Sequence, residues 1–337
     1  MKPAYRRRRL SEDGIIRILK ARFPARSPLV ETGIGDDAAV LRALPAPKCW
    51  IVTTDMLIEG VDFRQNWTTP AQLGRKALAV NLSDLAAMGA DPLFYTVALA
   101  LPRPVDPTWI SGFFRGLTSL GHKSGADLIG GDLSSSPSGI GIAITVLGVP
   151  AGRRAVRRSG GKAGDLLYVT GSLGRSAAGL KLLQSGVLQG RCRAERDALR
   201  AHLIPEPRCE VGAWLGRSGL PHCMMDLSDG LSVDLPRLCE ASGTGAEICA
   251  ASLPRFPESL AWQCDPLELA FHGGEDFELL FAVPPAKASL LEKRYPSKFP
   301  PLSRIGILTT ASGVRWRPAP GAKARPLVAK GYDHFCR

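Results

Sequence analysis

The sequence has no paired-cysteine motif and no long apolar run. Its eight cysteines include no C-x-x-C pair, which argues against a zinc site or a thioredoxin-like motif. Because no run of about 18 apolar residues occurs, we expect neither a membrane span nor a membrane partner. The Arg-rich start has no apolar segment before Glu12 and Asp13, which is unlike a secretory signal. We therefore expect a cytoplasmic protein with reduced thiols.

Several common catalytic signatures are also absent. Gly174 and Gly179 have the separation of a P-loop, but Leu180 occupies the position of its lysine. The same stretch, residues 171–181, lacks the G-x-G-x-x-G of dinucleotide-binding loops. The nucleophile elbow G-x-S-x-G and the zinc motif H-E-x-x-H are missing too. These absences disfavour the P-loop, Rossmann, serine-hydrolase and zinc-protease classes.

Acidic residues are fewer than basic ones, and the net charge is +12. Much of the excess lies in two runs, 6–9 and 153–158, and neither is interleaved with aromatic residues that could stack on bases. An anionic small substrate such as a nucleotide suits the same charge. We expect no nucleic-acid partner, although a basic nucleic-acid-binding scaffold without catalysis stays open as an alternative.

Short apolar runs alternate with longer helical patterns, which indicates a mixed α/β fold. The 337 residues are enough for two domains. The polar, Gly-rich and basic stretch 149–165 predicts a boundary between a domain of residues 1–150 and one of residues 151–337. We expect strands at 50–54, 94–101, 140–149, 166–171, 223–226 and 277–284, and helices at 71–88, 107–124, 176–186 and 235–243, the first two helices ending at left-handed Gly89 and Gly125.

Acidic residues recur where the predicted apolar elements end. Any one of them has an ordinary interpretation as a turn or a helix N-cap. A buried carboxylate on an apolar helix is costly, however, unless it is paired or binds a metal. Several Asp and Thr oxygens around one cavity suit Mg²⁺, which is commonly held between carboxylates and substrate phosphates. The positions are Asp36 and Asp37, Thr53 to Asp55, Asn81 and Asp84, Gly130 to Asp132, Asp226 to Asp229, and Glu275 with Asp276.

Eight segments match a known family pattern in order along nearly the whole chain. They are GIGDDAAVL, TTDMLIEGVDF, KALAVNLSDLAAMGADP, LIGGDLS, RRSGGKAGDLLYVTG, DLSDGLSVDL, GGEDFELLF and the terminal GYDHF. On these segments the sequence resembles the thiamine-monophosphate kinase family, which is related to aminoimidazole ribonucleotide synthetase.

The resemblance implies two α/β domains, with the N-terminal domains of two subunits pairing strand to strand in a homodimer. It places the active site in a cleft shared across that dimer. It also implies that ATP donates its γ-phosphoryl group to thiamine monophosphate, which gives thiamine diphosphate and ADP. Several Mg²⁺ ions would bridge the phosphates. The implied transfer is direct and in line, so no side chain becomes phosphorylated.

Residue roles follow from the same resemblance, position by position. The implied metal ligands are Asp36, Asp37, Thr53, Thr54, Asp55, Asp84, Asp132, Asp226 and Asp229, with Asp37 favoured over Asp36. The implied nucleotide contacts are Gly131, Asp132, Arg158 and Ser228. The implied substrate contacts are Asp62, Glu275 and Tyr332, of which Tyr332 would pack against the thiamine. Asp62 stands where the family often has His, on the substrate side of the site.

Other functions of the same fold fit less well. Selenophosphate synthetase is disfavoured because no early Cys lies in a Gly-rich loop, and a hydrogenase-maturation relative would end in Cys, whereas Cys336 is followed by Arg337. An ATP-using relative with a changed substrate stays open because of Asp62. A scaffold that has lost catalysis also stays open, although the intact set of acids is contrary evidence.

Overall fold

The computed structural model describes residues 18–32, 34, 40–43, 49–256 and 265–331. Backbone contacts divide the chain into two compact units. Unit 1 is Met1–Asn81 with Pro92–Gly148, and unit 2 is Leu82–Asp91 with Val149–Arg337. None of the helices in the described ranges is long and apolar enough to cross a membrane.

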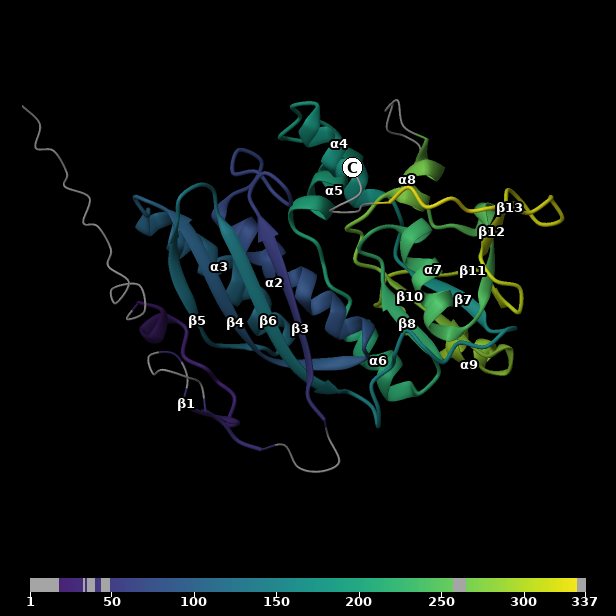
Figure 1. The fold of residues 1–337 in the computed structure, drawn as a ribbon, viewed down its shortest axis with the longest axis horizontal. Coiled ribbons are helices and arrows are strands. Elements are labelled where there is room, and N and C mark those ends of the chain that lie inside the picture. Colours follow the sequence, from purple (N-terminus) through teal and green to yellow (C-terminus); the bar gives the residue numbers. More distant parts are fainter. Residues whose placement is uncertain (1–17, 33, 35–39, 44–48, 257–264, 332–337) are drawn as a thin grey trace, which may run out of the picture. The chain divides into compact units, whose positions relative to one another are not determined.

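Unit 1 is organised around a four-stranded sheet in the order β3-β6-β4-β5 (Figure 1). Strand β3 pairs antiparallel with β6, and β4 pairs parallel with β5. Every second residue of β6 is buried, namely Ile142, Ile144 and Val146, because side chains alternate between the two faces of a strand. The strands are β3 (Ile51–Ile58), β4 (Ala90–Pro102), β5 (Asp127–Ser136) and β6 (Gly141–Pro150), and β1 (Val30–Thr32) and β2 (Val40–Leu41) form a separate antiparallel pair.

The two long helices of the first half form where the sequence predicts them. Helix α3 (Pro107–Ser124) begins after Asp106, whose carboxylate accepts the Thr108 N–H at 2.8 Å, and ends at Gly125 with φ of 79°. Helix α2 (Pro70–Ala87) carries fully buried leucines on several faces and is followed by the left-handed Gly89. Its first part belongs to unit 1 and its last turns to unit 2.

A seven-stranded sheet in the order β13-β12-β9-β11-β7-β10-β8 organises unit 2. Strand β10 pairs antiparallel with both β7 and β8, and every residue of these three strands is buried. Such burial requires cover on both faces of the sheet. The strands are β7 (Leu166–Thr170), β8 (Cys223–Asp226), β9 (Gly245–Cys249), β10 (Leu279–Val283), β11 (Leu302–Thr309), β12 (Val314–Arg317) and β13 (Arg325–Pro326).

Two apolar clusters provide that cover. Leu167 and Val169 of β7 face a cluster that includes residues of α7 and α8, whereas Leu166 and Tyr168 face a second cluster with residues of α6, α9 and the end of α2. The expected mixed α/β class is confirmed. The helices of unit 2 are α4 (Arg175–Gln184), α5 (Arg193–Leu203), α6 (Cys209–Ser218), α7 (Leu231–Ser242), α8 (Pro266–His272) and α9 (Pro285–Arg294), with a short 3-10 turn η1 (Ala250–Ser252).

Helices α2 and α3 approach each other through a glycine. A Cβ placed on Gly116 would lie 1.9 Å from the carbonyl oxygen of Ala71, a distance that forces the backbone of one helix to move. We expect Gly116→Ala to lower the free energy of unfolding by about 2 kcal/mol or more, because overpacking a core is destabilising. Chemical denaturation measures this loss. Gly141→Ala is the matched control, since its Cβ would meet only ordinary contacts at 3.7 Å, and an equal loss in both variants would contradict the prediction.

Candidate active site

Thr53, Thr54 and Asp55 lie inside β3, which continues to Ile58. The expectation that they end a strand is therefore wrong. Alternation along the strand puts Thr53 and Asp55 on one face and Thr54 on the other, where the Thr54 hydroxyl donates to the Ile144 carbonyl at 3.1 Å. The backbone N–H of Asp55 donates to Asn81 Oδ1 at 3.0 Å, so an amide of α2 lies beside the Thr53 and Asp55 face.

Gly131 and Asp132 also lie within a strand rather than after one. They belong to β5, and in the parallel pairing Gly131 lies opposite Val97 of β4. A Cβ on Gly131 would come within 2.1 Å of the Val97 carbonyl oxygen, so only glycine fits this close approach. Strands β6 and β4 separate β5 from β3, so the sheet does not bring Asp132 together with Asp55.

Asp226 occupies the end of β8, as expected, and is almost fully buried. Its carboxylate accepts a hydrogen bond of 2.6 Å from Ser83 Oγ, in the last turns of α2. Burial and the negative charge of Asp84 raise the pKa of Asp226 to about 7, and the Ser83 hydrogen bond acts in the opposite direction. The negative charge of Asp84 therefore acts on Asp226, and a cation beside Asp226 would relieve this repulsion.

The loop after β8 carries Ser228 and Asp229, and neither is the N-cap of α7. The N-cap is Gly230, without a side-chain hydrogen bond. The loop is held instead by buried Asp234, whose Oδ2 accepts the backbone N–H groups of Asp229 and Gly230 at 3.0 Å each. Arg237 donates to the carboxylates of both Asp229 and Asp234. Sequence reasoning missed Asp234 and Arg237, although the D-G-x-x-x-D spacing on a helix start was visible.

Arg158 has an exposed side chain and an anchored backbone. Its carbonyl accepts the Ser242 hydroxyl at 2.9 Å, and the carbonyl of the preceding Arg157 accepts the Met224 N–H at 2.9 Å. These bonds tie the basic segment to the end of α7 and to β8. The positive charge of Arg158 lowers the pKa of Asp226, which places Arg158 electrostatically near the acids of unit 2.

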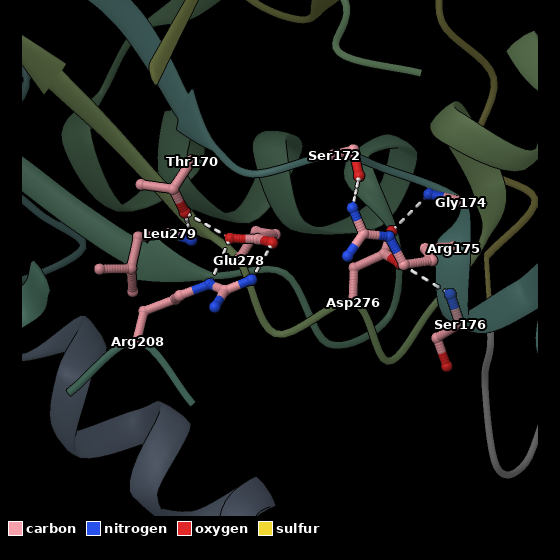
Figure 2. Close-up of polar contacts among 9 residues, drawn as sticks. All are labelled: Thr170, Ser172, Gly174, Arg175, Ser176, Arg208, Asp276, Glu278 and Leu279. Carbon is pink, nitrogen blue, oxygen red and sulfur yellow. Dashed lines mark hydrogen bonds and ion pairs between the residues drawn. The ribbon is translucent and has the colours of Figure 1, made fainter. Parts of the chain in front are cut away.

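The segment from Gly273 to Leu279 carries three acids with different partners, and Figure 2 shows Asp276 and Glu278 with theirs. Asp276 accepts the backbone N–H groups of Gly174 at 2.6 Å and Ser176 at 3.0 Å, at the start of α4. Burial raises the pKa of Asp276 to about 7, although these two hydrogen bonds act in the opposite direction. Glu275 lies at 3.0 Å from His202, between Oε2 and Nδ1.

The buried charge of Glu278 is balanced by an ion pair with Arg208. Arg208 Nε and Nη2 donate to its two carboxylate oxygens at 2.7 and 2.5 Å, and Thr170 Oγ1 donates at 2.7 Å (Figure 2). The side chains of Glu278 and Arg208 are 3% and 19% exposed. Burial lowers the pKa of Arg208, but the hydrogen bond and charge of Glu278 outweigh it and raise this pKa overall.

The remaining predicted site residues divide into two groups. Asp62 accepts the Ile58 N–H at 2.7 Å, so part of its carboxylate stabilises the turn after β3. Asp36, Asp37 and Tyr332 lie outside the described residues.

Within the described part of the chain, no three or more His, Cys, Asp or Glu residues are grouped to hold a metal by themselves. Mg²⁺ retains several waters and takes substrate phosphates as ligands, so two acids such as Asp84 and Asp226 fit it without a complete protein cage.

Comparisons with known proteins identify the family. The AIR synthase related protein models match over both parts of the chain, the N-terminal domain at residues 35–150 and the C-terminal domain at residues 162–316. The thiamine-monophosphate kinase of Escherichia coli K12 is 41% identical over 310 residues, which cover 91% of this chain and 92% of that protein. The Bacillus subtilis kinase is 35% identical, covering 91% and 94%. The chain belongs to the thiamine-monophosphate kinase family.

Solved structures agree with this membership. The thiamine-monophosphate kinase of Stenotrophomonas maltophilia K279a has a TM-score of 0.79 at 35% identity and covers 90% of this chain and 95% of its own. AaThiL, solved with AMPPCP and TMP, has a TM-score of 0.75 at 31% identity and covers 97% of each chain. Escherichia coli HypE, a hydrogenase maturation protein at 17% identity and a TM-score of 0.76, shares the fold alone. The predicted family and enzyme class are confirmed.

The Arg208 and Glu278 pair generates a stability prediction. Arg208→Met leaves a buried carboxylate without its cation, and we expect a loss of about 3 kcal/mol or more in the free energy of unfolding. The double variant Arg208→Met with Glu278→Gln removes the charge as well, so it recovers part of that loss. Urea denaturation of both variants checks this. A double variant less stable than Arg208→Met would contradict the role of the unpaired charge.

Proposed function

We propose that this chain transfers the γ-phosphoryl group of ATP to thiamine monophosphate, releasing thiamine diphosphate and ADP. The observation that carries the proposal is the buried Asp226, whose pKa is raised by burial and by the charge of Asp84, in a chain whose relatives are thiamine-monophosphate kinases. The complex of AaThiL with AMPPCP, an ATP analogue, and TMP supports the same pair of substrates.

The residues have distinct roles in this proposal. Asp84 and Asp226 of unit 2 supply oxygen ligands for Mg²⁺, and Thr53, Thr54 and Asp55 of unit 1 stay predicted ligands. Bound Mg²⁺ would neutralise charge on the phosphates during direct in-line transfer. Arg158 presents a planar guanidinium, which donates hydrogen bonds in pairs to a phosphate. Asp36, Asp37, Asp132 and Asp229 also stay predicted metal ligands. Gly131 and Ser228 stay predicted contacts of the nucleotide, and Asp62 and Tyr332 stay predicted contacts of the acceptor.

Loss of one metal-binding carboxylate tests the assignment. We expect Asp55→Asn and Asp84→Asn each to lower ADP release with ATP, Mg²⁺ and thiamine monophosphate by at least about 100-fold, because each removes charge at the phosphates rather than core volume. Circular dichroism verifies that both variants fold. Asp91→Asn is the matched control, since Asp91 is nearly half exposed and lies 3.4 Å from Arg217 at the surface.

The same assay separates the proposed substrate from the alternatives. The release of ADP by wild-type protein is measured with thiamine monophosphate, thiamine or an aminoimidazole-type substrate as the acceptor. ADP formed only with thiamine monophosphate, and lost on chelation of the metal, supports the proposal. ADP formed with another acceptor instead would point to a relative with a changed substrate. Wild-type rates in the Asp55 and Asp84 variants would overturn the metal assignment.

We also propose that the chain forms a homodimer through β3. This strand is at the edge of its sheet and exposes large apolar side chains, with Val52 59% and Met56 63% exposed. An exposed apolar edge strand is a template for pairing with another strand. The antiparallel addition of a second copy would cover this edge and its apolar face.

Charge placed on that face tests the dimer. We expect wild-type protein to have the mass of two chains and the double variant Val52→Asp with Met56→Asp that of one chain, because a desolvated carboxylate is costly. Light scattering after size-exclusion chromatography measures both masses. Val328→Asp is the control, since Val328 is 64% exposed in unit 2. A wild-type monomer, or a dimeric double variant, would contradict pairing through β3.

A further inference from the structure

A buried histidine of α5 contacts the acidic segment that precedes β10. The side chain of His202 is 6% exposed, and its Nδ1 lies 3.0 Å from Glu275 Oε2. The same nitrogen lies 3.1 Å from the hydroxyl of fully buried Ser176 in α4. Helices α4 and α5 therefore bring a serine and a histidine to Glu275, a carboxylate that neighbours Asp276 and the start of β10.

The chemistry of the two partners fixes the state of the imidazole. An ionised carboxylate only accepts hydrogen bonds, so Nδ1 must carry a hydrogen to bond Glu275. The Ser176 hydroxyl can then act toward Nδ1 only as an acceptor. A neutral His202 is thereby held in the tautomer protonated at Nδ1, and its ring is oriented by two contacts.

The backbone of Glu275 has a conformation that is unusual for a residue with a side chain. Glu275 has φ of 62° and Phe277 has φ of 50°, in the left-handed region that side-chain-bearing residues rarely adopt. The Glu275 N–H donates to the Ser228 carbonyl at 2.7 Å, and Asp276 is fixed to the start of α4. These contacts determine where the backbone of Glu275 lies, while His202 holds the end of its side chain.

We propose that His202 is a positioning residue that aims the Glu275 carboxylate at the phosphate acceptor. This inference rests on the proposed function and on the role of Glu275 as an acceptor contact. A carboxylate repels the phosphate of the acceptor, so it suits the cationic and N–H-donating organic part instead. Glu275 is 30% exposed, which leaves its carboxylate partly accessible while His202 holds one oxygen. His202 thus favours binding of the acceptor and has no role toward ATP.

Steady-state kinetics of full-length variants test this role. We expect His202→Leu to raise the KM for thiamine monophosphate roughly three- to tenfold, the range of one hydrogen bond, with the KM for ATP unchanged. His202→Asn places an amide N–H near the position of Nδ1 and should recover most of the wild-type KM. His222→Leu is the matched control, because His222 Nδ1 pairs with the buried Asp165 at 2.8 Å elsewhere in unit 2. We expect no change in the acceptor KM from that variant.

A double-mutant cycle with Glu275→Ala shows whether His202 acts through Glu275. If it does, His202→Leu has no further effect on the acceptor KM in the Glu275→Ala background. An equal rise in both backgrounds, or equal rises in the KM for ATP and for the acceptor, would overturn the inference. Wild-type protein without kinase activity would instead overturn the proposed function.

A second measurement is independent of turnover. In ¹⁵N-histidine-labelled protein, the resonances lost in His202→Asn identify the His202 ring, and their shifts distinguish the two neutral tautomers. We expect the Nδ1-protonated form in the wild type and a loss of that preference in Glu275→Ala. A wild-type ring protonated only at Nε2 would contradict the proposal whether or not the enzyme is active.

Discussion

The ion pair between Arg208 and Glu278 is the contact on which the acidic segment of unit 2 depends. Glu278 lies one residue before β10, and the Thr170 hydroxyl that donates to it also accepts the N–H of Leu279, the first residue of that strand. The pair thereby links α6, β7 and β10 around one buried charge. Because a buried carboxylate is unfavourable without such compensation, this arrangement fixes where β10 begins.

Glu275 and Asp276 take their positions from this fixed point. Asp276 bonds the first N–H groups of α4, where the helix dipole also favours a negative charge. The neighbouring Glu275 instead contacts His202, which also lies 3.1 Å from the Ser176 hydroxyl of α4. Three acids within four residues thus act separately, one in an ion pair, one at a helix N-terminus and one beside a buried histidine. Their different partners, rather than their shared charge, determine what each one does.

Sequence reasoning predicted elements well where local signals were strong. Asp106, Pro107 and Gly125 mark both ends of α3, and its predicted bounds agree with the structure. It failed where polar residues sit inside strands, because Asp55 and Asp132 look like strand ends in the sequence. It also missed His202, whose partners lie 26 and 73 residues away in the sequence and are brought near only by tertiary packing. Spacing along the chain carries no information on such contacts.

Some buried acids have their charge balanced by hydrogen bonds and an arginine of the protein, and these are structural. Buried acids without such partners are the candidates for binding a ligand. Buried Asp234 accepts two backbone N–H groups and pairs with Arg237, and Glu278 has a bidentate arginine, so both are satisfied by the protein itself. Asp226 is also buried, yet its carboxylate receives one hydrogen bond from Ser83, and the like charge of Asp84 raises its pKa. An acid kept in that state lowers stability unless something else neutralises it. This imbalance is the reason to propose a cation beside Asp226, rather than beside Asp234 or Glu278, in unit 2.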